Sequence, residues 1–166
     1  MLNHILIPLD QSELAETALE YASKLVGPDS RITLLTVIVP PDISFAALYN
    51  PADGVPPNRM ETTGSFESLE RQVRVQAEDY LRRVGTRLSE KGVKVDILVQ
   101  VGQDAETIVE NAANLNVDGI VMATHGRSGI SRWLLGSVTQ KVLGAAHCPV
   151  IVIPNRRRHP ADKAES

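Results

Sequence analysis

The sequence predicts an α/β domain built on an open, five-stranded parallel sheet with helices on both faces. Three observations lead to this prediction. Five short runs rich in Ile, Val and Leu are apolar at consecutive positions, which is typical of strands covered on both faces. Patterns of helical periodicity fill the intervals between these runs. The resulting order, βαβαβαβαβ, leaves one crossover helix between successive strands, as a parallel sheet requires.

The predicted strands are short and β-branched. They are expected at residues 4–9, 32–39, 93–101, 117–123 and 149–153. The third run alternates more than the others, because Lys94, Asp96 and Gln100 separate its apolar residues. We therefore expect this strand to lie nearer an edge of the sheet.

The predicted helices repeat apolar residues at spacings of three and four. They are expected at residues 12–26, 66–91, 105–115 and 137–147. The expected N-caps are Ser12, Asp104 and Ser137. The pair Gly27-Pro28 is expected to end the first helix. Gly85 lies inside the second helix, where glycine costs about 1 kcal/mol relative to alanine.

Composition narrows the classes of function. The chain carries 17 Lys+Arg against 20 Asp+Glu, a net charge of -3, which argues against a general nucleic-acid binder. The single cysteine, Cys148, excludes an intrachain disulfide and a cysteine-built zinc site. No apolar run reaches the roughly 20 residues of a membrane span. The start, MLNHILIPLD, has no signal-peptide pattern, so we expect a cytoplasmic protein without membrane contact.

A length of 166 residues suits one domain, expected over residues 1–154. Residues 40–65 form a long insertion that carries five of the ten prolines. We interpret it as a partly mobile surface segment, with a lid as the alternative. Residues 155–166 contain three consecutive arginines, Arg156, Arg157 and Arg158, followed by mostly polar residues. We interpret them as a solvated tail, with binding of phosphate or acidic lipid as the alternative.

Ligands of such sheets bind outside the carboxyl ends of the strands, where the strand order reverses. The segment at residues 124–137, THGRSGISRWLLGS, follows the fourth predicted strand and precedes the last helix. It and the helix start supply glycines, hydroxyls and arginines at Gly126, Arg127, Ser128, Gly129, Arg132, Gly136, Ser137 and Thr139. Glycines let backbone amides approach a ligand closely, and a helix start favours phosphate. The alternative is a glycine-rich connection that binds nothing.

Asp10 ends the first predicted strand and is expected to point into the same crevice. Its carboxylate would accept a hydrogen bond from a ribose hydroxyl or help to hold Mg²⁺. The alternative is a cap for the following helix, alone or with Ser12. A third interpretation, in which Asp10 accepts a phosphoryl group, would need an acidic residue in place of Ser12. The motifs GxxxxGK[ST] and GxSxG are absent, and no acid completes a triad with His125 and Ser128, which argues against a hydrolase.

Four segments together resemble the universal stress protein family over roughly residues 2–154. They are ILIPLDQSELAETALEYA, ITLLTVI, VGQDAETIVENA and DGIVMATHGRSGISRWLLGSVTQKVLGAAHCPVIVIP. The resemblance implies a Rossmann-like fold of the adenine nucleotide alpha hydrolase-like type. Nucleotide-binding members of the family carry G-x-x-G, nine residues, then G-[ST]. Here the frame starts at Ala123 and ends at Gly136-Ser137, so alanine replaces the first glycine.

The added Cβ of Ala123 would cost about 1–2 kcal/mol if that position required a positive φ, and little otherwise. By resemblance, the ligand is ATP, or AMP or ADP, with Mg²⁺ between phosphate and Asp10. The implied contacts are Pro8, Leu9 and Asp10 at the ribose and phosphates, Val37 at the adenine, Met122 and Ala123 at the ribose, and Gly126, Arg127, Ser128, Gly136, Ser137, Val138 and Thr139 at the phosphates.

The resemblance also implies a homodimer formed through the last strand, from Pro149 to Ile153, whose apolar edge would pair with its copy. The expected function is that of an ATP-binding, nucleotide-responsive regulator in stress response, acting on a protein partner that the sequence does not identify. No residue is clearly placed to activate water, so hydrolysis is expected to be slow at most. The alternatives are a dimeric interaction module without nucleotide, and a weak ATPase or self-phosphorylating protein.

Overall fold

The computed structural model describes residues 2–40, 59–124 and 135–154. In chain order the elements are β1 (Leu2–Pro8), α1 (Glu13–Leu25), β2 (Val26–Ile38), α2 (Arg59–Ser89), β3 (Lys94–Val101), α3 (Asp104–Asn114), β4 (Gly119–Ala123), α4 (Ser137–Ala145) and β5 (Val150–Ile153). Both the predicted element order and the open parallel sheet are confirmed. No helix within these ranges is long and apolar enough to cross a bilayer.

The five strands are all parallel and lie in the order β3-β2-β1-β4-β5. The expectation that the third strand lies at an edge is confirmed, and β5 forms the other edge. Strands β2 and β3 are added on one side of β1, whereas β4 and β5 are added on its other side, so the strand order reverses between β1 and β4. This switch point is the place at which the carboxyl ends of an open sheet bind ligands.

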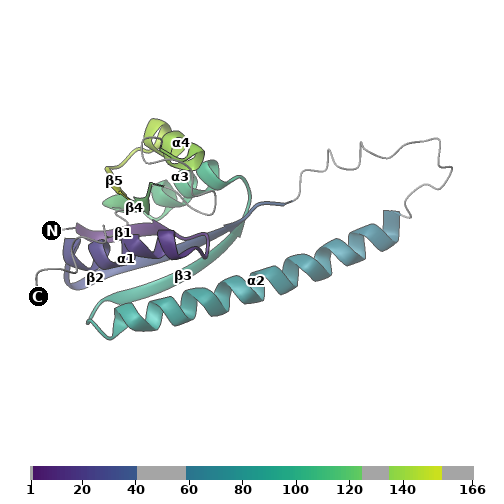
Figure 1. Ribbon diagram of the computed structural model, residues 1–166, viewed down its shortest axis with the longest axis horizontal. Coiled ribbons are helices and arrows are strands. Elements are labelled where there is room, and N and C mark those ends of the chain that lie inside the picture. Colours follow the sequence, from purple (N-terminus) through teal and green to yellow (C-terminus); the bar gives the residue numbers. More distant parts are fainter. Residues whose placement is uncertain (1, 41–58, 125–134, 155–166) are drawn as a thin grey trace, which may run out of the picture.

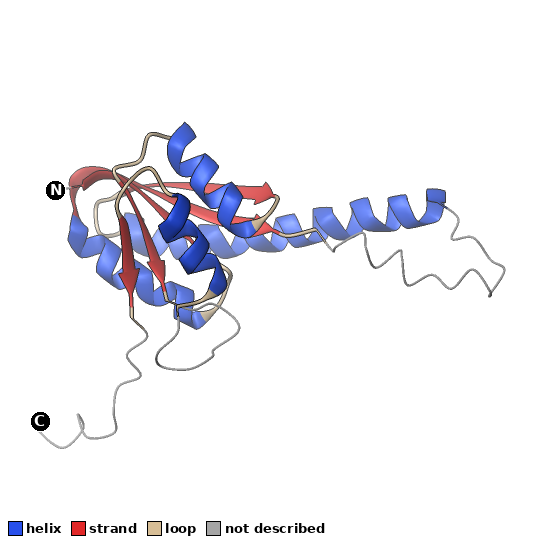
Figure 2. Ribbon diagram, turned by 90° about the horizontal axis from the view of Figure 1, so that it is seen from above, coloured by secondary structure: helices blue, strands red, loops and turns tan. Residues whose placement is uncertain are grey.

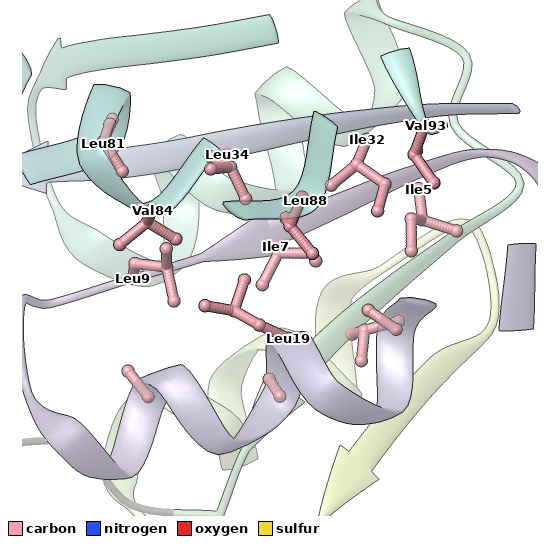
Figure 3. Close-up of a cluster of buried hydrophobic side chains, with 14 of the residues drawn as sticks. Ile5, Ile7, Leu9, Leu19, Ile32, Leu34, Leu81, Val84, Leu88 and Val93 are labelled. Carbon is pink, nitrogen blue, oxygen red and sulfur yellow. The ribbon is translucent and has the colours of Figure 1, made fainter. Parts of the chain in front are cut away.

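Helices cover both faces of the sheet, as Figures 1 and 2 show. Alternate residues of β1 enter the two cores, because successive side chains of a strand point to opposite faces. Ile5 and Ile7 join the core beneath α1 and α2, where Leu19 and Leu81 also pack (Figure 3). Leu6 joins the core beneath α3 and α4. Burial of each such side chain contributes about 1.5–3 kcal/mol, so the central strand is held from both sides.

The prediction that Gly27-Pro28 separates the first helix from a later strand is wrong. Helix α1 ends at Leu25, and β2 begins at Val26, which pairs with Leu2. The register then shifts, so that His4 pairs with Arg31. Inside this irregular stretch the Ser30 hydroxyl donates to the Leu2 carbonyl at 3.2 Å. Long-range pairing with β1 therefore extends the strand through residues that locally favour a turn.

Of the predicted N-caps, Ser12 is confirmed, since its hydroxyl accepts from the Ala15 amide at 3.1 Å. The other two predictions are wrong by one position. The caps are Gln103 and Gly136, and neither uses a side chain to cap its helix. Asp104 and Ser137 are instead the first helical residues.

Helix α2 begins within the predicted insertion and runs well past the sheet (Figure 1). The rest of that insertion, residues 41–58, and the tail at 155–166 lie outside the described residues. Packing explains why a glycine stands at position 85 in spite of its low helix propensity. A Cβ there would lie 3.2 Å from Val95 Cγ1. Glycine therefore lets α2 approach the sheet closely.

Candidate functional site

The candidate site lies at the carboxyl ends of β1 and β4, which are neighbours in the sheet. Their pairing joins Ile5 to Gly119 and Leu6 to Ile120. The predicted residues at positions 8–10 and 122–123 follow these pairs along the two strands, so the fold brings both groups to one edge. This edge is also the switch point of the sheet.

Leu9 extends the ladder beyond the end of β1. Its amide donates to the Leu35 carbonyl at 2.8 Å, and its carbonyl accepts from the Thr36 hydroxyl at 2.9 Å. Its side chain is buried among the residues packed beneath α1 and α2 (Figure 3). Leu9 thus fixes the backbone at the carboxyl end of β1, and both of its backbone polar groups have partners within the fold.

Asp10 follows at the turn into α1 and is half-buried. Its Oδ1 accepts from the Ser12 amide at 3.1 Å and from the Ser12 hydroxyl at 2.6 Å. Between them Gln11 has a φ of 67°, a left-handed conformation that residues other than glycine rarely adopt. Both sequence interpretations of Asp10 are therefore compatible: it supports the N-cap Ser12, and it lies at the carboxyl edge of the switch strand.

The start of α4 is attached to the end of β4. The Gly136 amide donates to the Thr124 carbonyl at 2.9 Å, and the Thr124 amide donates to the Ile153 carbonyl at 3.0 Å. The two ends of the glycine-rich connection therefore meet at one place. The first amides of α4, at Ser137, Val138 and Thr139, have no partner inside the helix. Together with the helix dipole they favour an anion at this point.

Val37 lies near the carboxyl end of β2, on the other side of β1 from β4. It pairs with Gln100 of β3 and packs against the core beneath α3 and α4. Met122 is buried in the same core, and Ala123 ends β4 half-buried. Five of the candidate residues lie outside the described residues: Gly126, Arg127, Ser128, Gly129 and Arg132.

No group of three or more His, Cys, Asp and Glu side chains in the described ranges could hold a metal ion. Asp10 is the only carboxylate among the predicted site residues. A bound Mg²⁺ would thus take most of its ligands from phosphate and water, as Mg²⁺ usually does in nucleotide sites. The residues fit an ion that arrives with a nucleotide better than an ion held by the protein alone.

A hollow of about 520 Å³ lies between α1 and the end of α2. Its walls carry charges of both signs, among them Glu16 and Arg87, which form an ion pair at 2.9 Å. None of its lining residues belongs to the predicted site. It is an open surface between two helices, whereas ligands of open parallel sheets bind at the carboxyl edge.

The sequence model of the Universal stress protein family matches residues 1–154. The chain belongs to the universal stress protein family. Two relatives from Methanocaldococcus jannaschii support this assignment along most of the chain. Universal stress protein MJ0531 is 32% identical over 93% of this chain and 83% of its own length. Universal stress protein MJ0577 is 30% identical over 94% of this chain and 97% of its own length.

Solved structures of universal stress proteins share the fold. The structure of MJ0577 superposes with a TM-score of 0.75 at 27% identity and covers 93% of this chain and 97% of its own. A family member from Arabidopsis thaliana, solved with AMP bound, has a TM-score of 0.62 at 18% identity over 99% of this chain and 96% of its own. Another, solved in complex with cAMP, has a TM-score of 0.60 at 18% identity over 92% of this chain and 97% of its own.

Sequence reasoning missed one hydroxyl that shapes this edge, that of Thr36, and gave another, that of Thr139, a different role. Thr36 holds the Leu9 carbonyl, and Thr139 donates to the carbonyls of Ala123 and Thr124, each at 3.3 Å. The signal for Thr36 was a polar residue inside the aliphatic run ITLLTVIV. Buried hydroxyls need hydrogen-bond partners, so a threonine near a strand end indicates a nearby free carbonyl.

Proposed function

We propose that this universal stress protein binds ATP, or AMP or ADP, across the carboxyl edge of β1, β2 and β4. It would act as a nucleotide-responsive regulator of a cytoplasmic protein partner in stress response. The observation that carries this proposal is the attachment of α4 to the end of β4. It brings the first amides of a helix to the carboxyl end of β4, the neighbour of the strand that Asp10 follows, and this suits a phosphate next to a ribose.

The class of ligand has support from two proteins of the same fold. One was solved with AMP bound and the other in complex with cAMP. Both ligands are adenine nucleotides, although they differ in how the phosphate is joined to the ribose. The same fold therefore accommodates the adenosine part that the proposed ligand shares with them.

Slow hydrolysis at most is part of the proposal. A general base must lie within hydrogen-bond reach of the attacking water. Asp10, the one carboxylate of the predicted site, is engaged by the amide and hydroxyl of Ser12. A turnover near 10 s⁻¹, typical of enzymes, would contradict this part of the proposal.

The test begins with the purified full chain. The protein is denatured, and any released nucleotide is identified by mass spectrometry. The nucleotide-free protein is then titrated with ATP and AMP while its melting temperature is followed. A ligand that binds only the folded state adds about 2.7 kcal/mol at a hundred times its Kd. We expect a clear rise with ATP.

The variant Gly136→Val tests whether the nucleotide binds at the start of α4. Branched methyl groups at the cap of α4 would block the approach of a phosphate to the first amides. We expect the variant to fold and to lose the ATP-dependent rise. No released nucleotide and no shift at millimolar ATP in the natural sequence would instead favour an interaction module that works through its surfaces. Equal ATP binding by both proteins would locate the ligand elsewhere.

We propose in addition that the protein is a homodimer joined through β5. In the described residues β5 pairs only with β4 and forms an edge of the sheet. The carbonyls of Pro149 and Ile153 accept bonds from the amides of Ile120, in β4, and of Thr124, which follows it. Backbone groups of a strand alternate in direction, so those of Val150 and Val152 point away from β4. They would form the contact with a second copy.

The variant Val152→Pro tests this interface, because proline removes an outward N–H and leaves the bonds to β4 intact. Sedimentation velocity should show a dimer for the natural sequence and a folded monomer for the variant. A monomer in the natural sequence would overturn the proposal, as would an unchanged dimer in the variant.

A further inference from the structure

Thr139 occupies an unusual position among the predicted phosphate contacts. It is the third residue of α4 and is 3% exposed. Its Oγ1 lies 3.3 Å from the Ala123 carbonyl and 3.3 Å from the Thr124 carbonyl. A hydroxyl has one proton to donate, so the two carbonyls share it. The hydroxyl is therefore used inside the fold, and only the amide of this residue is left for a ligand.

The Thr124 carbonyl joins several parts of the site. It accepts from the Gly136 amide at 2.9 Å as well as from the Thr139 hydroxyl. A carbonyl has two lone pairs, so this oxygen is fully used. The first turn of α4 is consequently attached at two points, the cap residue and the third helical residue, to the last residues of β4.

We propose that Thr139 is a positioning residue for the phosphate chain. Its hydroxyl holds the first amides of α4 at a fixed place beside the crevice, and it does not itself contact the nucleotide. The inference rests on the proposed function, since it concerns the same site. Donors that are held in place before binding cost less to organise around a charged ligand. Loss of the hydroxyl should therefore lower the affinity for the phosphates and leave the affinity for the nucleoside unchanged.

The experiment compares ATP and adenosine binding to the full chain by calorimetry. Thr139→Val keeps the shape of the side chain and removes the hydroxyl, whereas Thr139→Ser keeps the hydroxyl. Thr33→Val is the matched control. It also removes a buried hydroxyl, one that lies 2.9 Å from His4 Nε2 and away from the carboxyl edge.

We expect Thr139→Val to weaken ATP binding about fivefold, the effect of one hydrogen bond of typical net strength. Adenosine affinity should stay within about twofold, and Thr139→Ser should restore ATP binding. Thr33→Val should lower the melting temperature without changing either affinity. A purely structural role for Thr139 would give the same pattern as Thr33.

Three results would overturn the inference. They are unchanged ATP affinity in Thr139→Val, equal losses for ATP and adenosine, and failure of Thr139→Ser to restore binding. If the natural sequence binds no nucleotide, the proposed function fails first, and this inference fails with it. Should Thr139→Val not fold, amide hydrogen exchange of Thr139→Ala gives a second measurement. The amides of Gly136 and Gln140, which donate to the carbonyls of Thr124 and Gly136, should then exchange faster than in the natural sequence, and unchanged rates would also contradict the inference.

Discussion

Ala123 and Ile153 lie opposite each other in the parallel ladder of β4 and β5. Ala123 is the alanine that replaces the first glycine of the nucleotide-binding frame. As a strand residue it has no positive φ; in the described ranges, the non-glycine residues with a positive φ are Gln11, Asp29 and Asn116. The added Cβ therefore causes no backbone strain.

Ala123→Gly should accordingly bring no gain in nucleotide affinity. Glycine inside a strand lowers stability by about 0.5–1 kcal/mol relative to alanine. We expect that loss in a urea titration and an ATP affinity within about twofold by calorimetry. A tenfold tighter complex with the glycine variant would show that the Cβ of Ala123 obstructs the ligand.

Asp10 and Ser12 should separate two roles that their hydrogen bonds combine. Ser12→Ala removes the N-cap of α1 and should cost about 1 kcal/mol of stability with little change in ATP affinity. Asp10→Asn keeps the size of the side chain and removes its charge. It should weaken ATP in the presence of Mg²⁺ and reduce the dependence of binding on Mg²⁺. Equal effects of both substitutions on ATP would assign Asp10 to the helix start alone.

Two glycines should respond to alanine with opposite signs. A Cβ would meet nothing within 4 Å at Gly92 or at Gly144, so packing does not decide the result. Gly92 has a φ of +85°, where an alanine costs about 1–2 kcal/mol. Gly144 lies inside α4, where alanine should stabilise by about 0.5–1 kcal/mol. Free energies of unfolding in urea measure both effects, and a shared sign would contradict the backbone explanation.

His4 should make stability depend on pH. Burial and the nearby Arg31 lower the pKa of His4 below its usual 6.5, against the opposing carboxylates of Asp96 and Asp118. The folded state then takes up its proton at a lower pH than the unfolded state does. Stability is therefore fully present above pH 6.5 and falls as the pH drops through 6.5 towards the folded value.

Urea titrations at pH 7.5 and pH 5.5 measure this loss, and His4→Gln is the comparison that isolates it from the other histidines. The variant should lose less stability between the two pH values. Asp118 does not interfere, because bonds from the amides of His4 and Asn3 hold its pKa below the usual 3.8. Equal losses in the two proteins would contradict the assignment to His4.

The sequence predicted the sheet well because the polarity of each strand reflects whether helices cover both of its faces. Continuous apolar runs marked the strands covered on both faces, and the polar residues of β3 marked an edge. Ser12 was recognisable as a cap because its hydrogen bond to Ala15 spans only three residues. The expectation that the site lies at the carboxyl ends rests on the element order alone.

What the sequence by itself determined was therefore the order of elements, their apolar faces and the family frame from Ala123 to Ser137. Only the tertiary structure decided that β2 begins at Val26, that Gly136 caps α4, and that the Thr139 hydroxyl faces carbonyls of β4. Each of these depends on groups far apart in the chain, such as Leu2 and Val26. Local preferences favour a turn or a cap, and the partners that override them meet only when the sheet has assembled.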